Sequence, residues 1–85
     1  MSNELKKSLR DTVFIVRESN ILDVPDLIAA TTVWACVGSR DNYDETGTKV
    51  AGPIPGLFAE QVVEGLAALF GRLGYVVVVE VAADD

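Results

Sequence analysis

The last third of the chain carries a long apolar helix signal that runs directly into an apolar strand signal. The segment "PGLFAEQVVEGLAALFGRLG" opens with Pro55, has glutamates in its first half and an arginine near its end, and stops at Gly74. Proline at the start, acids early, a base late and glycine at the end are the sequence signals of a helix. We expect this helix over residues 57–73. The following "YVVVVEVA" predicts a strand, since residues 75–79 are all apolar.

Both of these elements are more apolar than a surface element needs to be. The helix is apolar over most of its circumference, which predicts burial on more than one side. Gly65 and Gly71 each cost roughly 1 kcal/mol relative to alanine in a helix, so they suggest the close approach of another backbone. An uninterrupted apolar run predicts a strand buried on both faces.

The backbone of this strand needs a hydrogen-bonded neighbour. Three candidates exist: residues 12–17, residues 31–37, or the same strand in a second subunit. The run "TVFIV" favours a strand at 12–17 because β-branched and aromatic residues dominate it. A short helix is expected at residues 3–10.

A second helix is expected to start at Asp23, with Pro25 in its first turn. This helix either ends near Ala30, which leaves residues 31–37 as a buried strand, or continues to Gly38. We favour the strand.

These elements predict one domain over residues 1–85, of the α+β class or a minimal α/β unit. A small sheet of two or three strands would pack against helix 57–73, with one or two shorter helices. Residues 82–85 are expected to form a frayed acidic tail.

Size and charge limit the function. With 49% apolar residues in only 85, one small domain has difficulty covering its apolar surface, which points to a homo-oligomer. The net charge is −6, and the few bases concentrate before Glu18. Nucleic-acid binding depends on basic groups that neutralise phosphates, so we expect no direct nucleic-acid binding.

Several chemistries are excluded by residue content. The chain has no histidine and a single cysteine, Cys36, so it cannot build a Ser–His–Asp triad, an imidazole zinc site or an internal disulfide. We therefore predict no enzyme activity, no catalytic residues, no metal and no cofactor. A single cysteine fits a reducing compartment. No run of about 20 apolar residues is present, so no membrane span is expected, and the chain is predicted to be cytoplasmic.

Between the two apolar halves lies "GSRDNYDETGTKVAGPIPG", residues 38–56, which we expect to be a long loop and the best candidate for a functional site. It does not match the phosphate-binding P-loop pattern, and Pro53 stands where a calcium loop needs a glutamate. A ligand-binding anion site could use its hydroxyl and basic groups and the helix start: Ser39, Arg40, Thr48, Lys49 and Gly56. A partner-binding surface could use its acids and its apolar positions: Asp41, Tyr43, Asp44, Glu45 and Ile54.

The order of an apolar strand, "GSR", a loop, a helix and "GYVVV" resembles in shape the first unit of small Rossmann-like nucleotide-binding folds. The resemblance covers generic residues and lacks a glycine fingerprint. It implies a nucleotide or other small ligand at the carboxyl end of strand 31–37, and it is our alternative hypothesis.

The leading hypothesis is a small acidic interaction module that self-associates and acts by binding another macromolecule, with a protein as its partner. By analogy with other small acidic domains, such a module would serve as an inhibitor or an adaptor. Phage-encoded proteins that block host defence enzymes are one example of this class.

Overall fold

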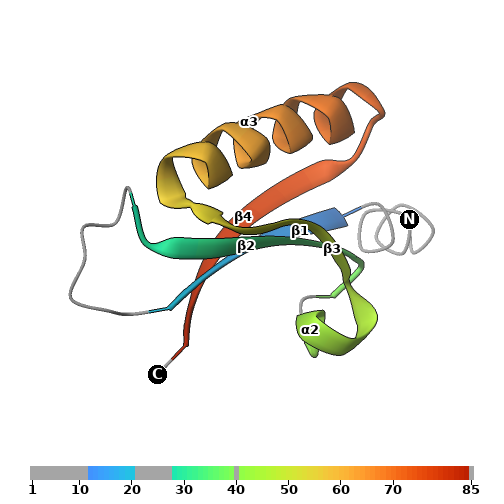
Figure 1. The fold of residues 1–85 in the computed structure, drawn as a ribbon. Helices are drawn as coiled ribbons and strands as arrows, with labels where there is room; N and C mark the ends of the chain where they lie inside the picture. Colours follow the sequence, from blue (N-terminus) through green and yellow to red (C-terminus); the bar gives the residue numbers. More distant parts are fainter. Residues whose placement is uncertain (1–11, 21–27, 40, 85) are drawn as a thin grey trace.

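The computed structural model describes residues 12–20, 28–39 and 41–84. They form a sheet with a long helix on one face and a short helix on the other (Figure 1). The elements in chain order are β1 (Thr12–Asn20), β2 (Ala30–Val37), α2 (Tyr43–Thr46), β3 (Thr48–Pro55), α3 (Gly56–Arg72) and β4 (Val76–Asp84). The fold is α+β, and its sheet has four strands where two or three were expected. The additional strand is β3, which lies in the segment predicted to be a loop.

The strand order is β3-β2-β1-β4, so β3 and β4 form the two edges. β1 pairs antiparallel with β2 and parallel with β4, and β2 pairs antiparallel with β3. The two edge strands therefore run in the same direction, and α3 connects them across the sheet. α3 begins directly after β3 and ends three residues before β4. It consequently crosses the sheet diagonally, from the carboxyl end of β3 to the amino end of β4.

The core lies between α3 and the sheet face that it covers. Alternate residues of a strand point to the same face, and directly opposed residues of neighbouring strands share a face. The buried side chains of this core come from β1, β2 and α3: Val13, Ile15, Val33, Ala59 and Val63. Burying one valine or isoleucine completely stabilises the fold by about 1.5–3 kcal/mol. The β-branched residues of β1 thus form the centre of the molecule.

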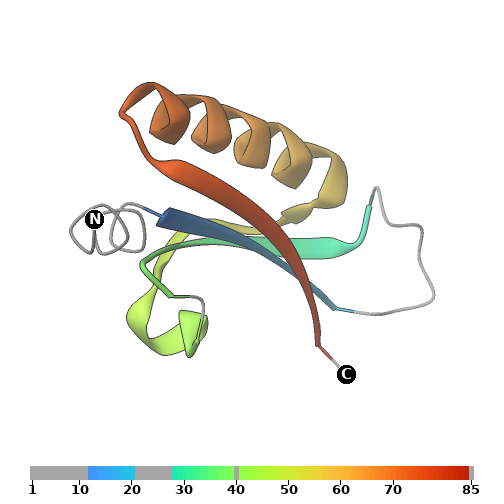
Figure 2. The same ribbon diagram turned by 180° about the vertical axis from the view of Figure 1, so that it is seen from behind.

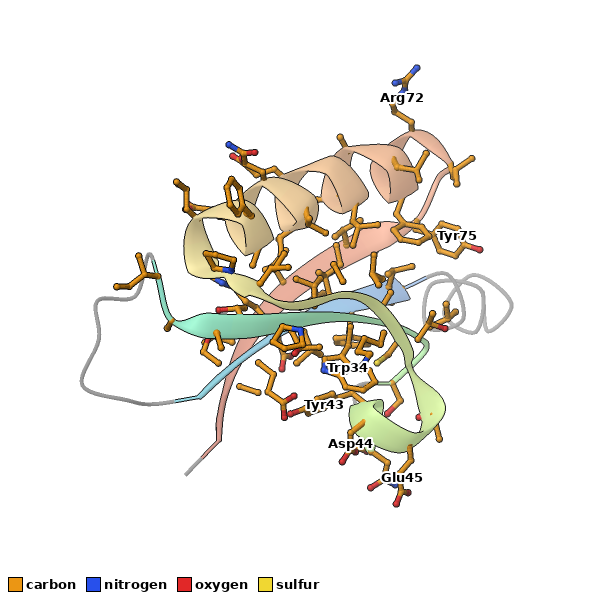
Figure 3. All side chains as sticks on the ribbon, in the orientation of Figure 1. Trp34, Tyr43, Asp44, Glu45, Arg72 and Tyr75 are labelled. Carbon is orange, nitrogen blue, oxygen red and sulfur yellow. The ribbon has the colours of Figure 1, made fainter. Side chains whose placement is uncertain are left out.

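The opposite face of the sheet holds a smaller cluster. Val16 and Cys36 are buried there, beside Phe14 and Trp34, which pair with them across β1 and β2. α2 lies against this face, and the ring centroids of Tyr43 and Trp34 are 5.8 Å apart in an edge-to-face arrangement (Figure 3). The sheet is therefore covered by α3 on one side and partly by α2 on the other.

The predicted loop 38–56 contains α2 and β3 instead of irregular chain. β3 is irregular for a strand, since its register with β2 shifts at two places. Gly52 has a φ of +120° and lies so close to β2 that a Cβ atom would approach the Thr31 carbonyl oxygen to 2.6 Å. Ile54 pairs with Thr31 and packs against the core. The glycine and prolines that predicted a loop are those that edge strands and bulges also accept.

Two burial predictions are wrong for the single chain. β4 is an edge strand, with Val76 and Val79 about half exposed, so its two faces are not fully covered. α3 buries one side only, and among the described residues nothing outside the adjoining part of the helix lies within 4 Å of a Cβ position at Gly65 or Gly71. An apolar pattern reports that a surface is suited to burial, but it does not report whether the same chain covers it.

Other expectations fall partly outside the described residues. The helix at 3–10 and nearly all of the segment after Asp23 lie outside them, and Ala30 already begins β2. β4 continues to Asp84, so the expected tail joins the sheet through that residue. Within the described parts of the chain, no helix is both long and apolar enough to cross a membrane.

Candidate functional site

The outer edge of β4 has no neighbouring strand in the described sheet, and Figure 2 shows β4 running uncovered across the front of the molecule. Its inner edge is fully engaged, because all nine residues pair with β1 in one unbroken register. The backbone N–H and C=O groups of an outer edge are a template for a further strand. This edge is the first element of the candidate site.

Apolar side chains accompany the edge. Val79 and Val81 pair with Ile15 and Arg17, so they lie on the sheet face that carries α3, yet they are 48% and 71% exposed. The diagonal course of α3 explains this exposure, because the helix ends over the amino end of β4 and leaves its carboxyl half bare. Val76, on the opposite face, is also about half exposed. We call the outer edge of β4 with Val76, Val79 and Val81 the β4 surface.

The two edges of the sheet differ in how they resist pairing. β3 contains Lys49, Pro53 and Pro55 and has two register shifts, which are features that protect an edge from further strands. β4 contains no proline, no lysine and no register shift. Its charged residues are Glu80 and the terminal Asp84. β4 is therefore the edge better suited to accept another strand.

A second exposed apolar region lies on α3. Phe58 and Leu69 of α3 and Leu73, the C-cap residue of this helix, are separated by eleven and four residues, so they lie along one side of the helix. Phe58, Leu69 and Leu73 are 55%, 51% and 64% exposed. Isolated exposed apolar residues are common, but an ordered row of them is less so. We call this row the α3 stripe.

Below the sheet, Glu18 holds α2 in place. The Trp34 Nε1–H donates to its Oε1 at 3.2 Å, and the Tyr43 hydroxyl donates to its Oε2 at 2.8 Å. Figure 3 shows Trp34 and Tyr43 on the side of the sheet away from α3. Both carboxylate oxygens thus have donors within the chain. The cluster joins β1, β2 and α2, and we interpret it as structural.

The predicted ligand-binding residues do not converge. Ser39 follows the carboxyl end of β2, where its Oγ accepts a bond from the Asp41 N–H at 3.1 Å. Gly56 lies at the other end of the sheet, after the residue that pairs with Ala30, and its carbonyl accepts a bond from Arg17 Nη2 at 3.3 Å. Thr48 and Lys49 are exposed on β3, and Arg40 lies outside the described residues. The N-terminus of α3 and Ser39 thus lie at opposite ends of the sheet.

The predicted partner-binding residues divide between three surroundings. Asp41, Asp44 and Glu45 are exposed in and before α2, as Figure 3 shows for the last two. Tyr43 is half-buried against Trp34 and Glu18, and Ile54 packs against the core. Among the residues the structure describes, no three cysteine or carboxylate side chains gather in a group that could hold a metal ion.

Sequence reasoning missed Glu18 and Trp34, which meet Tyr43 only because the fold brings β1, β2 and α2 together. It did identify the apolar excess of residues 75–79, and it included the same strand of a second subunit among the possible neighbours. The position of β4 at an edge had no signal in the sequence. Comparisons of the chain with protein-family models, curated proteins and solved structures give no match.

Proposed function

We propose that this protein is a small, acidic, non-enzymatic interaction module that self-associates and acts by binding a protein partner, as an inhibitor or an adaptor does. The observation that carries the proposal is the β4 surface, an unprotected strand edge flanked by exposed valines. Strand addition at such an edge is a recurrent mode of protein recognition, in which backbone hydrogen bonds give affinity and alternate side chains give specificity.

The energetics support association as well. Covering an exposed valine or leucine contributes up to about 1.5–3 kcal/mol, whereas association costs about 4–15 kcal/mol in lost freedom and ordering. A single residue is not enough to offset this cost. The β4 surface and the α3 stripe together supply six side chains that are about half exposed or more: Phe58, Leu69, Leu73, Val76, Val79 and Val81.

The residues available for chemistry support a binding role over catalysis. The chain contains no histidine, and its one cysteine is buried on the α2 side of the sheet. The Glu18 carboxylate already accepts two hydrogen bonds from within the chain. A nucleophile within hydrogen-bond reach of a base is the usual mark of covalent catalysis, and the described residues offer no such pair.

Light scattering coupled to size exclusion tests the proposal on the full chain at micromolar concentrations. We expect a mass that rises with concentration above the 9.1 kDa of one chain. A dye that binds exposed apolar surface provides the second measurement: Leu69→Ser with Leu73→Ser should reduce its binding, whereas the matched Glu60→Gln with Glu64→Gln should not. A constant mass of one chain, with no dye binding by the wild type, would remove the support for an interaction module.

A further inference from the structure

We infer that two copies of the chain pair antiparallel through β4, about a two-fold axis at Val79, and so form one continuous eight-stranded sheet. This inference rests on the proposed function and specifies its first partner, a second copy of this chain. It commits to the edge, to the direction of pairing and to the register.

The symmetry follows from the geometry of antiparallel strands. Directly opposed residues in such a pair share a face of the sheet. Two identical antiparallel strands can satisfy this condition only if the two-fold axis stands perpendicular to the sheet and passes midway between the two copies of one residue. Both copies of α3 then lie on the same face. Closed two-fold dimers of this kind are the commonest oligomers of soluble proteins.

The register follows from the side chains of β4. An axis at Val79 places Val77 opposite Val81 of the partner subunit, so all six opposed residues on the α3 face are valines. On the other face, Val78 lies opposite Glu80 of the partner subunit. An axis one residue further would place the two copies of Glu80 directly opposite each other, and like charges in opposed positions are destabilising.

The diagonal of α3 makes this edge self-complementary. The bare part of each copy is the carboxyl half of β4, with Val79 and Val81, whereas α3 ends over the amino half. Antiparallel pairing places the bare half of one strand beside the amino half of the other, next to the end of α3 of the partner subunit. The end of α3 in one copy would thus cover the exposed carboxyl half of β4 in the other copy.

The charges favour the same direction. Each β4 ends at an acidic residue, Asp84. In an antiparallel pair the two acidic strand ends lie far apart, at opposite ends of the interface. In a parallel pair the two acidic ends would lie side by side.

The decisive experiment is cross-linking of Val79→Cys in the full chain. At a two-fold axis the two cysteines would have Cβ atoms about 4.5–5.5 Å apart, within reach of a disulfide or a short bis-maleimide. We expect a covalent dimer. The wild type, whose Cys36 is 3% exposed, and Val50→Cys, on the β3 edge, are the controls that should stay uncross-linked at the same concentration.

A second pair of variants gives an independent measurement. Val81→Asp places a charge at a position that is exposed in the single chain and covered in the dimer. Because covering this charge costs free energy, the dissociation constant of the dimer should rise about tenfold. Val50→Asp, on the other edge, should leave dimerisation unchanged. If the wild type is oligomeric but Val79→Cys does not cross-link, or Val81→Asp does not weaken the oligomer, the β4–β4 arrangement is wrong. The proposed function as an interaction module is then still supported. If the wild type is a monomer at all concentrations, both fall.

Discussion

Gly52 and Gly65 stand in opposite surroundings, although neither has a side chain to contribute. Gly52 has a φ of +120°, and a Cβ there would approach both the Thr31 carbonyl oxygen and the Thr32 Cα to 2.6 Å. Gly65 lies in the middle of α3 on an exposed side, with open space where a Cβ would be. The first glycine is required by the contact between β2 and β3. The second only weakens the helix.

We therefore predict opposite effects of the same substitution. Gly52→Ala should lower the free energy of unfolding by about 2–4 kcal/mol, because it combines a strained backbone with a clash against β2 that cannot relax easily. Gly65→Ala should raise it by about 0.5–1 kcal/mol, since alanine is the better helix former. Urea unfolding followed by circular dichroism measures both. A neutral Gly52→Ala would mean that β3 does not approach β2 as closely as described.

Among the elements, those with a pronounced apolar pattern could be predicted, and the two without one, α2 and β3, could not. The valines of β4, the run "TVFIV" of β1 and the helix signals of α3 each identified the element correctly, with ends within a few residues. β3 was missed because Gly52, Pro53 and Pro55 interrupt its alternation. A sequence pattern also cannot tell an edge strand from a central one, since that depends on which strands the fold places on either side.

The candidate site was predicted only in part for the same reason. The surplus of apolar residues in strand 75–79 and helix 57–73 was visible in the sequence, whereas its concentration at one edge results from the diagonal course of α3. The polar residues of segment 38–56 looked functional because they were numerous. In the structure the described polar residues lie around α2 and the amino end of β3, whereas Gly56 lies at the other end of the sheet and Ile54 packs against the core.

At the level of elements, we predict that α2 depends on the bond between Tyr43 and Glu18. Tyr43→Phe removes a 2.8 Å hydrogen bond to a carboxylate, while it keeps the ring that packs on Trp34. The free energy that holds α2 against the sheet should fall by about 1 kcal/mol, since the site is only half-buried. It should be local, with faster amide hydrogen exchange at residues 43–47 and little change in β1.

Asp44→Asn, an exposed neighbour on the same short helix, is the matched control and should leave this exchange unchanged. Equal acceleration in both variants, or in neither, would show that α2 is held by something other than Glu18.

For the whole molecule, the net charge of −6 opposes the self-association that its apolar surfaces favour. Pairing two copies brings like charges together, and this repulsion acts over the Debye length, about 30 Å at 0.01 M salt and about 8 Å at 0.15 M. The interface inferred above consists of backbone hydrogen bonds and valines, which salt does not screen in this way. Salt should therefore strengthen the dimer: we expect its dissociation constant to fall about three- to tenfold between these two salt concentrations.

Sedimentation equilibrium at the two salt concentrations measures the effect. Glu60→Gln with Glu64→Gln, which removes two exposed charges from α3, should tighten the dimer at low salt and reduce its dependence on salt. An interface built on ion pairs would behave in the opposite way, because screening weakens attraction between unlike charges as much as repulsion between like ones. A dissociation constant that rises with salt would therefore contradict the valine interface even if the protein is dimeric, and it would direct attention to the acidic residues around α2 instead.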